Sequence, residues 1–176
     1  REAIDAAYQA YIYTGEQKYA DWVIVHLDRI ASMYPDMTTS NQKVADGFLH
    51  SDGSSGLGKI MGRIWETSII RSYLFAYDAV FDAYDTMSEE AKAFLKKVSH
   101  GKRDTYKKLM CHVEQGLFME IFPAVRDAVI HGNQGMHQYT LATAAVVLDH
   151  KTLSKQWLDY IFATSSGSKG NLDGVF

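Results

Sequence analysis

Cysteine is almost absent from this sequence, because Cys111 is the only one among 176 residues. A single thiol cannot form a disulfide within the chain and cannot supply half of a cysteine-based zinc site. Long apolar runs are also missing, and none reaches the length of a membrane span. The net charge of -3 leaves no basic surface for wrapping nucleic acid. We therefore expect partners that are neither membranes nor nucleic acids.

Proline is scarce as well, and the segments around Pro35 and Pro123 have the apolar spacing of amphipathic helices. No stretch alternates polar and apolar residues with hairpin turns, so strands are not expected beyond a short ribbon. Hydrophobic residues make up 47% and charged residues 22%, which is typical of a globular protein. The sequence predicts one all-α domain over residues 1–176, built from antiparallel helical hairpins.

Turn and capping signals place the expected helices. Thr14 with Gln17 has the spacing of a capping box, and Ser88 followed by two glutamates predicts a helix that ends near Gly101. Pro35 ends the second helix, and Pro123 is expected to interrupt the chain between two later ones. Further helices are predicted over residues 60–85, 103–122, 134–149 and 152–163.

A long loop is expected from Thr38 to Lys59, rich in Gly, Ser and Asp. Its residues Gly53 to Lys59 fit the first seven positions of a phosphate-binding loop. Ile60 stands where that motif needs a hydroxyl residue, and no buried strand precedes Gly53. We therefore interpret this stretch as a plain loop and expect no nucleotide.

The tract IHGNQGMHQ, residues 130–138, concentrates polar side chains directly before an apolar helix. Asn133 is a favoured helix cap, so one interpretation is that it only satisfies backbone donors. Alternatively, Asn133, His137 and Thr140 form a polar stripe at a helix N-terminus, where partial positive charge favours a carboxylate ligand. His131 and His137 are six residues apart and lack an acidic companion, so we expect neither a metal site nor a cofactor.

Three tracts occur in an order that resembles a known family. They are AYIYTGEQKYADWVIVHLDRIASMYP, GRIWETSIIRSYLFAYDAVFD and HGNQGMHQYTLATAAVVLDH. Together they resemble the helical domain of heparinase II/III-like polysaccharide lyases, in the chondroitin AC/alginate lyase superfamily. The resemblance implies an incomplete (α/α) toroid with a substrate groove, and a C-terminal β-domain in a longer chain. It also implies a periplasmic or secreted protein that acts on an acidic polysaccharide.

In that family an Asn neutralises the carboxylate of a uronic acid, so that a Tyr or His can remove the adjacent proton in a β-elimination. The resemblance assigns this role to Asn133, with His131, Gln134 and His137 as its catalytic neighbours. Several relatives carry His where this chain has Gln134, which can donate hydrogen bonds but cannot act as a base. The family's catalytic Tyr lies further downstream than Phe176, so residues 1–176 alone are expected to be inactive.

The start of the predicted helix 60–85 offers candidate substrate-binding residues. Trp65 suits a sugar face, Arg63 suits a carboxylate or sulfate, and Glu66 lies beside them. A core Trp with a solvated ion pair is the alternative interpretation.

Two other functions remain open. A glycoside hydrolase or unsaturated glucuronyl hydrolase would need two carboxylates, and the candidate pairs are Glu66 with Asp78 and Glu114 with Glu120. A non-catalytic glycan-binding domain would use the same groove without Asn133. A truncated toroid would also expose apolar helix faces, which favours self-association.

Overall fold

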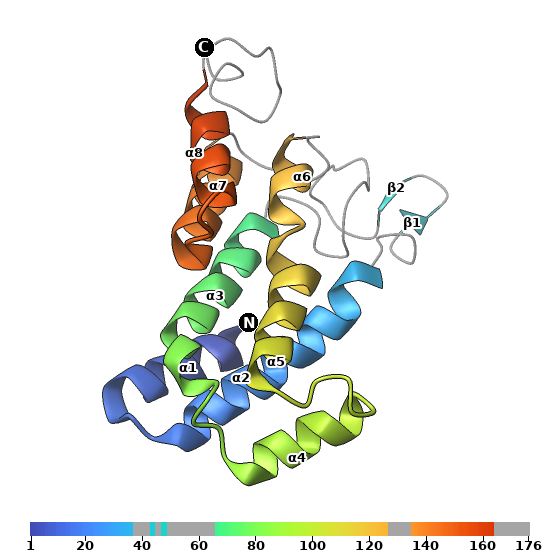
Figure 1. Cartoon of the computed structure of the whole chain (residues 1–176). Coiled ribbons are helices and arrows are strands. Elements are labelled where there is room, and N and C mark those ends of the chain that lie inside the picture. The colour runs from blue at the N-terminus through green and yellow to red at the C-terminus, as the bar shows by residue number, and fades with distance from the viewer. Residues whose placement is uncertain (37–42, 45–46, 49–65, 127–134, 164–176) are drawn as a thin grey trace. The chain divides into compact units, whose positions relative to one another are not determined.

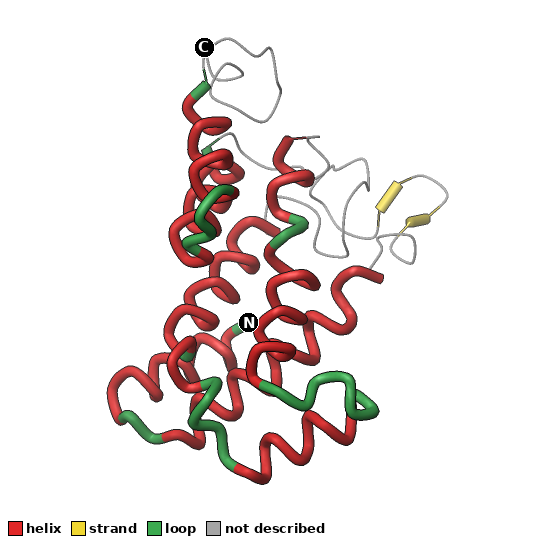
Figure 2. The backbone as a smooth tube through the Cα atoms, viewed as in Figure 1, coloured by secondary structure: helices red, strands yellow, loops and turns green. Residues whose placement is uncertain are grey.

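The computed structural model describes residues 1–36, 43–44, 47–48, 66–126 and 135–163. Within these residues the chain forms eight α-helices, and the all-α prediction is confirmed (Figure 1, Figure 2). One antiparallel ribbon pairs β1 (Lys43–Val44) with β2 (Gly47–Phe48) in the part of the chain expected to be a loop. The toroidal arrangement of the helices stays a prediction.

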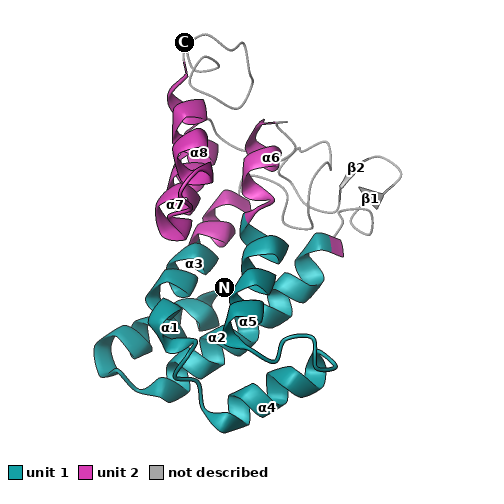
Figure 3. Ribbon diagram, viewed as in Figure 1, with its two compact units in different colours: residues 1–35, 72–118 teal, residues 36–71, 119–176 magenta. Residues whose placement is uncertain are grey.

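The described helices belong to two compact units, shown in two colours in Figure 3. Unit 1 consists of residues 1–35 and 72–118, and unit 2 consists of residues 36–71 and 119–176. The helix α3 (Glu66–Ala79) gives its first residues to unit 2 and the remainder to unit 1. Each unit therefore combines segments that are distant in the sequence.

Unit 1 begins with a helical hairpin of α1 (Glu2–Thr14) and α2 (Gln17–Met33). Gly15 ends α1 in the left-handed conformation, with φ of 67°, which glycine adopts without strain. The prediction that Thr14 caps the second helix is wrong. Thr14 is the last residue of α1 and its hydroxyl donates to the carbonyl of Ala10, so Glu16 takes the N-cap position of α2.

The core of unit 1 forms around the buried face of α2. Helix α5 (Tyr106–Val113) and the π-helical turn Glu114–Phe118 both pack against α2. A Cβ atom added to Gly116 would lie 2.5 Å from the carbonyl oxygen of Ala31, so only glycine allows this close approach. Residues of α2 and α3 that contribute to this core are Ala20, Val23, Ile24, Leu27, Leu74 and Tyr77.

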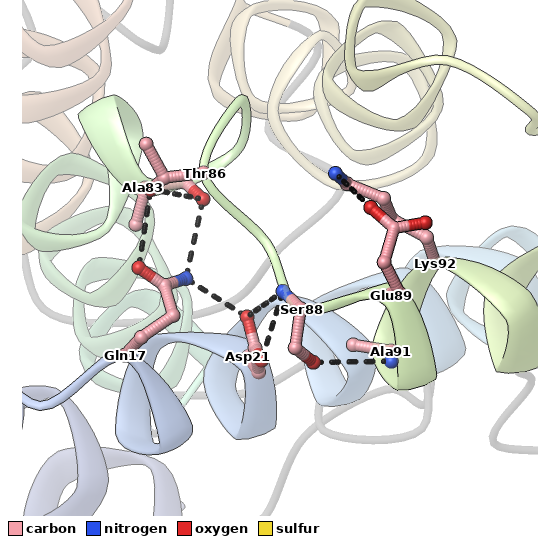
Figure 4. A network of polar contacts seen from close by, with 8 residues as sticks. All are labelled: Gln17, Asp21, Ala83, Thr86, Ser88, Glu89, Ala91 and Lys92. Atoms are coloured by element: carbon pink, nitrogen blue, oxygen red, sulfur yellow. Dashed lines mark hydrogen bonds and ion pairs between the residues drawn. The ribbon is translucent and has the colours of Figure 1, made fainter.

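The predicted cap at Ser88 is confirmed, and a buried carboxylate supports it (Figure 4). The Ser88 hydroxyl accepts a hydrogen bond from the Ala91 amide at 3.2 Å, in the first turn of α4 (Glu89–Val98). Asp21 of α2 accepts the Ser88 amide at 3.2 Å and the side chain of Gln17 at 2.8 Å. These bonds tie the start of α4 to α2.

Unit 2 contains α6 (Ile121–Arg126), α7 (Met136–Leu148) and α8 (Leu153–Phe162). Helix α7 packs against both α6 and α8. The ring of Phe122 stacks on Trp157, with 5.9 Å between the ring centroids. The predicted helices 134–149 and 152–163 correspond to α7 and α8, although Gln134 lies outside the described residues.

Two predicted helices differ from the observed ones. The segment predicted as one helix over 103–122 contains α5, the π-helical turn and the start of α6. Pro123 does not interrupt the chain after that segment, because it occupies the third position of α6, where a missing N–H costs nothing. Helix α3 ends at Ala79, before the 3-10 turn Phe81–Ala83, so the described part of the predicted helix 60–85 is shorter.

Candidate functional site

Two of the predicted site residues, Glu66 and His137, lie in the described part of the chain. Glu66 is the first residue of α3 and is fully buried, whereas His137 is the second residue of α7 and is partly exposed. The other predicted site residues lie outside the described residues: Arg63, Trp65, His131, Asn133 and Gln134.

The described N-terminus of α7 begins at Gly135. Gly135 occupies the N-cap position with φ of 88°, and the helix begins at Met136. The amide of Gly135 donates to the side-chain oxygen of Gln138 at 2.7 Å, and Gln138 is buried. The described helix therefore begins at Met136 rather than at Gln134, and the capping interpretation of Asn133 concerns a residue outside the described part of the chain.

Arg71 of α3 contacts this same end of α7, within unit 2. One terminal nitrogen of its guanidinium donates to the Thr140 hydroxyl at 3.0 Å and lies 3.5 Å from the Met136 carbonyl oxygen. The guanidinium carbon is 4.3 Å from the ring centroid of Tyr139, which is a cation–π distance, and Tyr139 is 55% exposed. A positive charge and an exposed aromatic ring thus meet at the first turn of α7.

The hydroxyl of Thr140 adds a further polar contact between α7 and α3. Its hydroxyl is 2.8 Å from the Met136 carbonyl and 3.2 Å from the carbonyl of Thr67, so it can donate to one of these while accepting from Arg71. Arg71 was not among the predicted site residues. The available signal was a lone cation in an otherwise apolar stretch, since Ile69, Ile70 and Tyr73 surround it in the sequence.

Glu66 is the most unusual ionisable group in the described part of unit 2. Its side chain has no exposed surface, and neither carboxylate oxygen has a hydrogen-bond partner among the described residues. Burial raises the pKa of Glu66 to about 7, because charging the carboxylate away from water is unfavourable. Such a group titrates near neutral pH, which is the range in which proton-transferring residues work.

Replacing Glu66 with Gln is expected to remove a pH-dependent loss of stability. Between its ordinary pKa of 4.5 and about 7, the unfolded chain releases this proton while the folded chain keeps it, so stability falls as pH rises. As the pH rises from about 4 to about 8, the unfolding free energy of Glu66→Gln should increase by about 3 kcal/mol relative to that of the parent chain. Urea unfolding across this range measures the gain. If the difference in unfolding free energy between Glu66→Gln and the parent chain did not change with pH, and so matched that of the exposed control Glu120→Gln, the burial of the Glu66 carboxylate would be contradicted.

The structure places the two carboxylate pairs considered for a hydrolase in different surroundings. Glu66 and Asp78 lie on one helix twelve residues apart, and the helical rise separates them by about 18 Å along its axis, too far for a glycosidase pair. Glu114 accepts a hydrogen bond from the Tyr77 hydroxyl at 2.6 Å. Burial, and then this bond to Glu114, raise the pKa of Tyr77 above its usual range, so Tyr77 stays protonated at neutral pH.

Unit 1 has a buried polar cluster that the sequence did not indicate. Arg103 places its Nε atom 2.7 Å from the Oδ1 atom of Asp28, which is 3% exposed. The Nε2 atom of His112 is 3.9 Å from the same oxygen and 3.0 Å from the hydroxyl of Ser32. Burial raises the pKa of Asp28 although Arg103 and His112 oppose it, and burial followed by the charge of Arg103 lowers the pKa of His112.

No protein-family model matches the chain, and searches of the curated proteins and of the solved structures found no match. The described part of the chain brings together no group of three or more His, Cys, Asp or Glu that could hold a metal ion. Among those same residues, no helix combines the length and apolar character needed to cross a membrane. The resemblance to the lyase family remains a prediction from the sequence.

Proposed function

We propose that the chain is the helical part of a polysaccharide lyase that cleaves a uronic-acid-containing polysaccharide by β-elimination. The observation that carries the proposal is the guanidinium of Arg71 at the first turn of α7. This turn begins three residues after Asn133 in the sequence. A helix N-terminus and a guanidinium both favour a bound carboxylate, which is the group that distinguishes a uronic acid from a neutral sugar.

The chemical task explains why donors and positive charge belong at this site. A base removes the proton from the carbon that bears the carboxylate, and the electron pair forms a double bond as the neighbouring carbon–oxygen bond breaks. The departing oxygen then takes a proton. Negative charge builds up on the uronate carboxylate in this transition state, and fixed donors stabilise it without reorganising. In the proposal Asn133 supplies the donor, and Arg71 supplies positive charge nearby.

The surrounding residues support a sugar-binding role. Tyr139 presents a half-exposed ring beside Arg71, and aromatic rings of this kind pack against sugar faces. Gln138 accepts the amide of Gly135 at 2.7 Å and so holds the start of α7 in place beside Arg71. His137 lies in the same first turn, so a proton-transferring group is close to the proposed carboxylate position.

Replacing Arg71 with Met tests this proposal by binding, without requiring catalysis. Oligosaccharides of alginate and chondroitin serve as probes, and their carboxyl-reduced forms serve as neutral counterparts. We expect Arg71→Met to weaken binding of the uronate forms by about tenfold to a hundredfold, the scale for a hydrogen bond to a charged group. Arg71→Lys should lose less, because it keeps the charge but not the planar donor geometry.

The exposed Arg29 of α2 provides the matched control, and Arg29→Met should bind as the parent chain does. Circular dichroism and thermal unfolding verify that each variant is folded. Equal affinity of the parent chain for native and carboxyl-reduced oligosaccharides would contradict the proposal. That outcome would favour a neutral-glycan-binding domain instead.

A further inference from the structure

Unit 1 contains a hollow that the proposed function does not use. It measures about 400 Å³, which is within the range of small-molecule sites. Its lining consists of three aromatic residues, two carboxylates and one methionine: Phe81, Tyr84, Tyr106, Asp82, Asp85 and Met110. Among the described residues, no Lys, Arg or His lines it.

Most of the lining comes from one short segment. Phe81–Ala83 is a 3-10 turn, and Tyr84 and Asp85 follow it directly in the chain. Tyr106 at the start of α5 adds a further ring. The hollow therefore brings acidic and aromatic side chains together.

The negative charge in this hollow is not neutralised by the protein. Among the described residues, neither Asp82 nor Asp85 forms a hydrogen bond or an ion pair with a side chain, and both are exposed. A second hollow shares Tyr84, Asp85 and Tyr106 with the first and includes two cations. Those cations have their own partners, because Lys92 pairs with Glu89 and Arg103 pairs with Asp28.

Two of the three aromatic side chains are accessible for contact. Phe81 is 45% exposed and Tyr106 is 43% exposed, whereas Tyr84 is buried. The ammonium group of Lys107 lies 6.0 Å from the centroid of the Tyr106 ring, at the outer limit of a cation–π contact.

We propose that this hollow binds a small organic ammonium ion. Aromatic faces attract a cation through their negative charge density, and the two carboxylates add a direct electrostatic attraction. A uronate would be repelled by the same carboxylates, so this site is separate in chemistry from the proposed polysaccharide site. A neutral sugar offers no charge to satisfy Asp82 and Asp85.

A pair of ligands with the same shape and different charge tests the proposal. Choline is the cationic probe, and 3,3-dimethylbutan-1-ol, in which carbon replaces the quaternary nitrogen, is its neutral counterpart. Ligand-observed NMR on the chain measures the affinity for each. We expect choline to bind about tenfold more tightly than the alcohol, and to lose affinity as salt is added.

Variants locate the binding site. The double variant Asp82→Asn with Asp85→Asn should bring choline down to the affinity of the alcohol, and Tyr106→Leu should weaken choline binding by about fivefold. Asp78→Asn, which alters an exposed carboxylate of α3 outside the hollow, should leave it unchanged. All substituted positions are exposed, so folding is expected to persist, and thermal unfolding verifies it.

Equal binding of choline and the alcohol would overturn the proposal, and so would the absence of measurable choline binding. Choline binding that survives in the double variant would place the cation elsewhere and would also overturn it. None of these results bears on uronate binding, because the probes carry no carboxylate.

Discussion

Replacing Arg103 with Met is expected to lower the free energy of unfolding by roughly 3–5 kcal/mol, because it leaves Asp28 as an unpaired charge inside unit 1. Asp28 is 3% exposed and Arg103 is 16% exposed, so water cannot replace the lost partner. His112 can compensate only in part, since its Nε2 atom is 3.9 Å from the Asp28 oxygen, farther than the 2.7 Å of the Arg103 contact. Urea unfolding at neutral pH measures the loss.

Two further variants separate the effect of burial from that of the ion pair. Lys108 and Asp104 form a pair with the same 2.7 Å separation but on the surface, and Lys108→Met should cost much less than Arg103→Met. Adding Asp28→Asn to Arg103→Met removes the stranded charge and should recover much of the stability. If Arg103→Met lowered the free energy of unfolding no more than Lys108→Met does, the interior position of the Arg103–Asp28 pair would be contradicted.

If the proposed lyase function holds, replacing Asn133 with Ala in a protein that includes the predicted C-terminal β-domain is expected to lower turnover by about two to three orders of magnitude. This is the scale for removing one fixed donor from a developing oxyanion. If Asn133 served only as a helix cap, the same change would instead cost roughly 1 kcal/mol of stability and leave turnover nearly intact. Turnover and unfolding free energy, measured on the same variant, distinguish catalysis from capping.

Asn133→Asp provides the sharper comparison. Asp has nearly the size of Asn, but it would place a negative charge against the substrate carboxylate. The expected result is a stable protein with at least as large a loss of turnover as Asn133→Ala. A stable and fully active Asn133→Asp enzyme would leave carboxylate neutralisation by this residue without support.

Local signals in the sequence were sufficient for most of the helices. Ser88 predicted its helix correctly because a serine before two glutamates satisfies free backbone amides through contacts within one turn. The prediction of Thr14 as a helix cap was wrong because Gly15, one residue later, adopts the left-handed conformation that ends a helix. The prediction that Pro123 interrupts the chain was wrong because proline is tolerated in the first turn of a helix and so does not always mark a helix end.

The polar contacts of both units could not be predicted in the same way. Asp28 and Arg103 are 75 positions apart, and Arg71 and Thr140 are 69 apart, so no local pattern relates them. The sequence did single out Glu66, but as an exposed substrate-binding residue beside Arg63. The structure buries Glu66 completely. Burial of a lone carboxylate depends on tertiary packing, which residue type alone does not reveal.

The product of the reaction tests the proposed function most directly. Alginate and chondroitin, each in native and carboxyl-reduced form, are incubated with the full-length protein, and both ultraviolet absorbance and new reducing ends are followed. β-Elimination predicts that the two signals rise together on a native polymer and that neither rises on its reduced form, while residues 1–176 alone produce neither. New reducing ends without ultraviolet absorbance would indicate hydrolysis and would contradict the lyase.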